Sequence, residues 1–67
     1  MLKEYDVVLL KQSIPEVPLP SGTRGAILMV YHDNPPAYEV EFVDDFGNSL
    51  GVHTVREVDL SLICDGG

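Results

Sequence analysis

The chain has 67 residues, enough for one small domain and too few for a second hydrophobic core. Eleven acidic residues against four basic ones give a net charge of −7, which disfavours nucleic-acid binding because Lys and Arg supply most of that affinity. The sequence has no apolar run near the roughly 18 residues of a membrane span and no signal-peptide pattern. We therefore predict a soluble, cytoplasmic domain over residues 1–67, ordered from 3 to 64, that binds neither membrane nor nucleic acid.

A domain of this size gains little net stability from its own core, roughly 3–5 kcal/mol. Small domains often add disulfides, metals or partner subunits to compensate. Cys64 is the only cysteine, so the chain cannot form an internal disulfide, and one thiol fits a reducing compartment. These observations favour self-association.

The first strand is predicted over residues 5–12, "YDVVLLKQ", because the stretch is rich in β-branched and aromatic residues. Its apolar residues are expected on both faces, Val7 and Leu9 on one and Val8 and Leu10 on the other. Residues 13–22, "SIPEVPLPSG", contain three prolines, which lack a ladder donor and favour extended backbone in the residue before them. This segment is predicted to be an ordered, meandering loop.

The second strand is predicted over residues 23–32, "TRGAILMVYH", entered through Gly22 and Gly25, where a sharp bend or a close backbone approach is expected. Its middle, residues 26–31, is apolar without a break. Periodicity alone does not distinguish such a run from a buried helix, but its length and the flanking Gly and Pro residues favour a strand.

The third strand follows a turn at 33–36, "DNPP", and covers residues 37–43, where apolar and acidic side chains alternate. An Asp-Phe-Gly-Asn turn at 45–48 leads into a fourth strand at 49–55, in which Gly51 is expected to mark a bulge. The end of the chain predicts a helical turn at 57–60 and a fifth strand at 61–64. Gly66 and Gly67 are expected to fray.

Together these elements predict an all-β fold, a small five-stranded SH3-like barrel with a long Pro-rich first loop. Barrel closure would remove exposed strand edges, which otherwise invite aggregation. In this reading Tyr38, Val40 and Phe42 close the barrel.

Three phrases resemble a family of very short bacterial proteins, common in cyanobacteria and described as domain of unknown function four-nine-two-six. They are "YDVVLLKQSIPE", "GTRGAILMVY" and "AYEVEFVDDFGNSL", in this order and spacing, and the resemblance covers roughly residues 3–64. It departs at "VPLPS" and "NPP", where glycine and charged residues are more usual. The resemblance implies an SH3-like barrel and no catalytic motif that carries over to this sequence.

Acidic residues offer the first candidate chemistry. Glu39 and Glu41 lie about 7 Å apart on one strand face and could serve as acid and base or as metal ligands. An alternating strand places such residues in solvent, where no apolar pocket would raise a carboxylate pKa, and we favour this reading. The Asp44–Asn48 turn offers oxygen ligands for Ca²⁺, but it lacks the ligand alternation and terminal Glu of an EF-hand loop.

Two other candidates are equally weak. His32, Asp33 and His53 would be a minimal transition-metal set only if they converged, which the sequence does not show. Cys64 lies in the apolar phrase "SLIC" and is expected to be a small buried residue. We therefore predict no catalytic, cofactor-binding or metal-binding residue, and no cofactor.

The unbroken apolar run at 26–31 is the strongest candidate for a functional surface. One set of its side chains faces away from the core if the strand alternates, and something else must then cover that set. Either the Pro-rich loop 13–22 folds over it as a lid, or a partner does. The predicted interface residues are Ile27, Met29 and Tyr31 on the strand, with Val17 and Leu19 on the loop.

Four functional hypotheses follow. We favour a non-enzymatic protein-interaction module that self-associates into a small symmetric homo-oligomer. The alternative is an acidic antitoxin or immunity-type partner of a basic enzyme, since charge complementarity steers such pairs. A nucleic-acid-binding barrel would depend on the four scattered cations Lys3, Lys11, Arg24 and Arg56. An enzyme ranks last.

Overall fold

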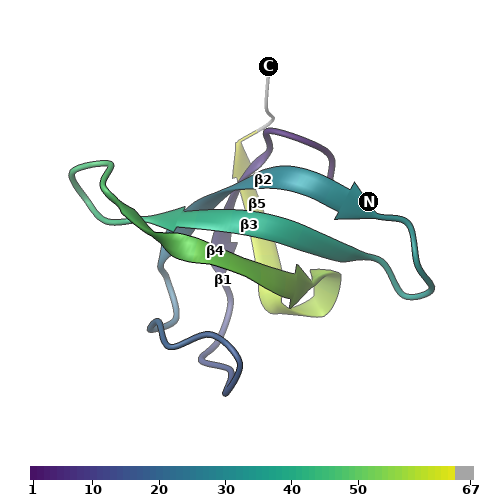
Figure 1. Ribbon diagram of the computed structural model, residues 1–67, viewed down its shortest axis with the longest axis horizontal. Helices are drawn as coiled ribbons and strands as arrows, with labels where there is room; N and C mark the ends of the chain where they lie inside the picture. Colours follow the sequence, from purple (N-terminus) through teal and green to yellow (C-terminus); the bar gives the residue numbers. More distant parts are fainter. Residues whose placement is uncertain (65–67) are drawn as a thin grey trace.

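The computed structural model describes residues 1–64 as one antiparallel five-stranded sheet with the strand order β4-β3-β2-β1-β5. The elements are β1 (Val7–Leu10), β2 (Arg24–Tyr31), β3 (Ala37–Val43), β4 (Ser49–Arg56), the 3₁₀ helix η1 (Glu57–Asp59) and β5 (Leu60–Cys64). Figure 1 shows β2, β3 and β4 side by side, with β1 and β5 crossing behind them. The predicted all-β fold is confirmed, and the predicted fraying at Gly66 and Gly67 lies outside the described residues.

The strand bounds follow the sequence closely, apart from β1, which is shorter than the predicted 5–12. β3 covers the predicted residues, and η1 separates β4 from β5 as expected. Within residues 1–64, β4 pairs only with β3 and β5 only with β1. These two are therefore edge strands, and backbone pairing between them does not close the sheet.

The core lies on one face of the curled sheet, and alternation places it there. The apolar residues of β1 divide between two faces as predicted. Val8 and Leu10 are buried in the core, whereas Val7 and Leu9 point to the other face, which we call the outer face. The buried apolar residues are Val8, Leu10, Val17, Ile27, Tyr38, Val40, Phe42, Val55 and Leu60. All five strands and the loop after β1 therefore contribute to one core.

A bulge in β2 explains why its apolar run does not alternate. Ile27 pairs with Val40 and Met29 pairs with Glu39, so Leu28 is left without a partner on β3. The bulge keeps Ile27 facing the core and directs Met29 to the outer face. The prediction of Ile27 as an interface residue is wrong, because its side chain is fully buried among the core residues.

The Pro-rich loop between β1 and β2 is a lid on this core. Val17 is only 2% exposed and belongs to the core cluster, and it forms an isolated bridge with Ile14. Leu19 packs against the core and is half-buried. Val17 is therefore also wrongly predicted as an interface residue, since the loop uses it to cover the sheet.

Glycines allow the sheet to curl at two places. A Cβ on Gly25 would lie 2.7 Å from Val40 Cγ1 and 2.9 Å from the Glu41 carbonyl oxygen, so β2 and β3 approach closely there, as predicted. Gly51 has φ +114° and follows the extra residue Leu50, which confirms the predicted bulge in β4.

Two buried carboxylates flank the β1–β5 ladder. Asp6 accepts hydrogen bonds from the Lys3 amide at 2.9 Å and from Lys3 Nζ at 3.0 Å. Asp59 accepts a hydrogen bond from Gln12 Nε2 at 3.0 Å and lies 3.7 Å from the Arg56 guanidinium. Both carboxylates have polar partners, as buried charges require. They fix the segments that enter β1 and β5.

Candidate functional site

The outer face of β2, β3 and β4 holds what remains of the predicted interface. Met29 is 47% exposed, and Tyr31 is half-buried. Met29 lies opposite Glu39, whose carboxylate accepts a 2.6 Å hydrogen bond from the Thr54 hydroxyl. Glu39 and Glu41 both lie on this face, opposite the core, in agreement with their interpretation as the solvent side of the strand. This part of the surface therefore combines exposed apolar side chains with carboxylates.

The opposite end of the sheet also carries exposed apolar side chains. Leu62 and Ile63 of β5 are 46% and 49% exposed, and Val58 of η1 is more exposed still. β5 contains no charged residue and pairs with β1, which contains none either. We call Val58, Leu62 and Ile63 the β5 surface.

Sequence reasoning missed this surface because "SLIC" was interpreted as a buried phrase. The predicted burial of Cys64 is wrong, since Cys64 is exposed. The pairing of β5 with β1 shifts register between Val7 and Val8, and residues 62–64 lie at the free edge of the sheet with no strand beyond them in residues 1–64. The sequence signal that could have revealed this surface is the absence of charged residues from both β1 and β5.

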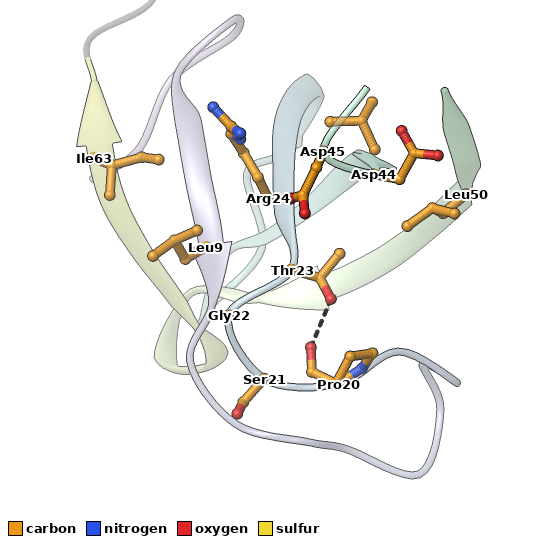
Figure 2. Close-up of a pocket in the computed structure, with 11 residues that line it drawn as sticks. Leu9, Pro20, Ser21, Gly22, Thr23, Arg24, Asp44, Asp45, Leu50 and Ile63 are labelled. Atoms are coloured by element: carbon orange, nitrogen blue, oxygen red, sulfur yellow. Dashed lines mark hydrogen bonds between the residues drawn. The ribbon is translucent and has the colours of Figure 1, made fainter. Parts of the chain in front are cut away.

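A cleft of about 430 Å³ on the outer face borders β5. Figure 2 shows Leu9 and Ile63 on neighbouring strands at one side, and Asp44, Asp45 and Leu50 at the other, with Arg24 between them. Its floor at Pro20 and Thr23 is held by a 2.7 Å hydrogen bond from the Thr23 hydroxyl to the Pro20 carbonyl. The cleft is open and offers an apolar wall with one cation beside it.

A second cleft, of about 530 Å³, lies on the other side of β5. Leu62 lines it together with Met1, Leu2, Val58 and Leu60. Two prolines of the β2–β3 turn, Lys11 and Glu57 complete its lining. Because neighbouring residues of a strand point to opposite faces, Ile63 lines the first cleft and Leu62 the second. The edge of β5 therefore has apolar surface on both sides.

Tyr38 fixes the walls of the second cleft. Its buried hydroxyl donates a hydrogen bond to the Glu57 carboxylate and accepts one from the Leu2 amide at 3.1 Å. Burial raises the pKa of Tyr38 to about 12, and the hydrogen bond to Glu57 adds to this shift. The tyrosine thus links β3 to η1 and to the N-terminal segment.

In the acidic turn after β3, the carboxylate of Asp44 accepts hydrogen bonds from other residues of the same turn. Asp44 Oδ1 accepts the amides of Phe46 at 2.8 Å and Asn48 at 2.9 Å, and Oδ2 accepts the Asn48 side chain at 3.2 Å. These bonds, chiefly the one from the Asn48 amide, lower the pKa of Asp44. Asp44 therefore forms the turn, as Asp does in many tight turns.

The histidines do not form the metal set considered from sequence. His53 packs its ring against Phe42, with centroids 6.1 Å apart, and His32 follows β2. In residues 1–64 no three His, Cys, Asp or Glu side chains are grouped as metal ligands, and no helix there has the length and hydropathy to span a membrane. Of the four cations, Lys3 and Arg56 are paired with the buried carboxylates.

Comparison with known proteins gives one match. A family model described as "Domain of unknown function (DUF4926)" matches residues 4–62. No curated protein and no solved structure matches the chain significantly.

Proposed function

Because the chain belongs to the DUF4926 family, whose description states no activity, we propose its function from its surface. It is a non-enzymatic interaction module that self-associates into a small symmetric homo-oligomer. The observation that carries this proposal is the β5 surface, where Val58 and Leu62 are exposed beside one cleft and Ile63 is exposed beside the other. Grouped exposed apolar side chains mark interfaces more often than isolated ones do.

Charge supports the location of the contact. Each copy carries a net charge of −7, so two copies repel one another except where the contact is uncharged. β1 and β5 carry no charge, whereas β3 presents Glu39 and Glu41 on its outer face. A standard interface of about 800 Å² per partner would cover roughly a fifth of the 4220 Å² surface of one copy.

We further propose that the domain is SH3-like and cytoplasmic. The strand order, the long first loop and the 3₁₀ helix between β4 and β5 support an SH3-like arrangement, although β4 and β5 do not pair and so leave the expected barrel open within residues 1–64. The exposed thiol of Cys64 suits a reducing compartment, where it stays reduced.

Light scattering after size-exclusion chromatography tests self-association. We expect a mass of at least about 15 kDa at micromolar concentration, twice the 7.4 kDa of one chain. Ile63→Asp is expected to shift this mass towards the monomer, while Met29→Asp, at a similarly exposed position, leaves it unchanged. If the unmodified chain is a 7.4 kDa monomer at every concentration, self-association is wrong.

A second candidate is an acidic partner of a basic protein, as in antitoxin and immunity pairs. The outer face favours it, because Glu39 and Glu41 lie beside the exposed Met29 and Val52. Co-expression with the products of adjacent genes tests it. A complex that salt weakens and that Glu39→Lys and Glu41→Lys abolish supports this candidate. Recovery of the chain without any such product counts against it.

A further inference from the structure

Val58 is held in solvent by the residues on either side of it. It is the middle residue of η1 and is 63% exposed. The Glu57 carboxylate accepts a hydrogen bond from the buried Tyr38 hydroxyl. The Asp59 carboxylate, which is buried, accepts one from Gln12 Nε2 at 3.0 Å. Because both neighbours are anchored to the fold, the backbone that presents Val58 is already ordered before any partner covers it.

The cleft beside Val58 is apolar and carries two opposite charges. This is the second cleft, of about 530 Å³, and its rim includes the exposed side chains of Met1 and Leu62. Lys11 and Glu57 are the two charged side chains of its lining. The side chains that line the cleft are therefore net neutral in a chain whose net charge is −7. A second acidic copy meets less repulsion here than at the carboxylates of β3.

Both charges of this cleft lie on fixed backbone, and neither is used up within residues 1–64. The Lys11 amide donates to the Asp59 carbonyl at 2.8 Å, but the Lys11 ammonium forms no ion pair in the described part of the chain. Glu57 Oε1 accepts the Tyr38 hydroxyl, which leaves Oε2 for a second donor. A two-fold axis through the cleft would place each of these charges opposite its counter-charge in a second copy.

We infer that two copies pack these clefts face to face about a two-fold axis, with Val58 of each copy inserted into the cleft of the other. This inference rests on the proposed self-association and specifies its geometry. Val58 then contacts Leu62 and Met1 of the second copy, and Lys11 of each copy lies opposite Glu57 of the other. Such a contact is isologous, so it closes at two copies.

Apolar burial drives this contact, and the charge pairs set its orientation. The exposed apolar side chains around the cleft leave water when the two clefts meet. Val58 lies at the centre, where interface side chains contribute most to affinity. The two pairs of Lys11 with Glu57 add little affinity but disfavour other orientations. Ile63 follows Leu62 in β5 and so borders the contact from the outer face.

Oxidative cross-linking of mixed chains tests the insertion of Val58. One chain carries Val58→Cys and the other Leu62→Cys, both with Cys64→Ser, and one chain is labelled with a heavy isotope. Mass spectrometry then separates mixed pairs from like pairs. We expect the mixed disulfide to exceed either like disulfide by about tenfold, because only positions 58 and 62 of different copies come within disulfide range. Statistical amounts of the three pairs, a dominant like pair or no disulfide at all overturns the inference.

Light scattering over a dilution series is the second measurement. Val58→Lys and Val52→Lys add the same charge at exposed valines. We expect Val58→Lys to raise the dimer dissociation constant at least about tenfold and Val52→Lys to leave it unchanged. Lys11→Gln should raise it about threefold, with Arg24→Gln, at another exposed cation, as the control. Equal effects within either matched pair overturn the inference, and unchanged circular dichroism shows that the variants fold.

Solution mass separates this inference from the proposed function. If the unmodified chain is an oligomer and Val58→Lys has no more effect than Val52→Lys, the cleft contact is wrong and self-association stands. If the unmodified chain is a monomer at every concentration, both are wrong, and the cleft does not receive a second copy.

Discussion

The hydroxyl of Tyr38 on β3 donates a hydrogen bond to the carboxylate of Glu57 in η1, so the core is linked directly to the segment that leads into β5. The same oxygen accepts the Leu2 amide. One buried atom thereby positions two chain segments that line the cleft beside Leu62.

Tyr38→Phe removes this link and is expected to destabilise the fold by about 2 kcal/mol. Hydrogen bonds to charged groups contribute about 1.5–3 kcal/mol, and the Leu2 amide loses its partner as well. Urea unfolding at pH 7 measures the change. Tyr5→Phe, at an exposed tyrosine, is the matched control and should stay within about 0.5 kcal/mol of the unmodified chain. An unchanged midpoint for Tyr38→Phe would contradict the prediction.

Alkaline pH is expected to destabilise the fold through the same group. Burial and the bond to Glu57 raise the pKa of Tyr38 from 10.0 to about 12 in the folded state. Above pH 10 the unfolded chain loses this proton first, so the stabilisation present below pH 10 is lost by about pH 12. We expect a fall of about 1.4 kcal/mol per pH unit over this window. Tyr38→Phe should lack this loss of stability between pH 10 and pH 12. If the free energy of unfolding fell in parallel with pH in the unmodified chain and in Tyr38→Phe, the prediction would be contradicted.

Gly25→Ala is expected to destabilise the sheet by about 2 kcal/mol, because a Cβ would overlap Val40 and the backbone of Glu41. Thermal and urea unfolding measure the change. Gly22→Ala is the comparison: it has open space around its Cβ but φ +89°, so only backbone strain of about 1 kcal/mol is expected. Similar losses at the two positions would argue against close packing at Gly25.

Val17→Ala tests the lid. Removing two buried methyl groups from the core is expected to lower the free energy of unfolding by about 2 kcal/mol. The solution mass should not change, because Val17 offers no surface to a partner. Glu16→Ala, at the exposed neighbouring position, is the control. If Val17→Ala kept its stability but lost self-association, the result would support the original prediction that Val17 is an interface residue.

Asp44→Ala is expected to lower the urea midpoint, since Phe46 and Asn48 lose their acceptor in the turn. Asp45→Ala, at the next residue, should leave the midpoint unchanged. Because the pKa of Asp44 is lowered in the folded state, its carboxylate stabilises the fold at pH values above the usual Asp pKa. This stabilisation is lost as the pH falls through the pKa of the folded state. Carboxyl chemical shifts recorded against pH check this direction, and an Asp44 that titrates in the usual range would refute it.

The sequence predicted β3 and its turns best, because Tyr38, Val40 and Phe42 alternate with acidic residues and only one face can be buried. It also placed the bulge at Gly51 and the close approach at Gly25. These features depend on local chemistry, which a single sequence displays directly.

The candidate site was harder to predict. Nothing in "AILMVY" marks Leu28 as the bulged residue, because apolar side chains stand on both sides of it and alternation cannot be read there. The burial of Val17 and the exposure of Leu62 depend on how far the loop reaches and which strand lies at the edge. Contacts between distant segments decide both, and the sequence pattern does not encode them locally.

The loop between β1 and β2 places Val17 in the core, and this has a consequence for engineering. Although it is the longest connection in residues 1–64, it is a poor place to graft a foreign peptide, because an insertion would displace part of the core. The tip of the β3–β4 turn is the better graft site. Phe46 is 89% exposed there, and Asp44 and Asn48 hold the base of the turn independently of it.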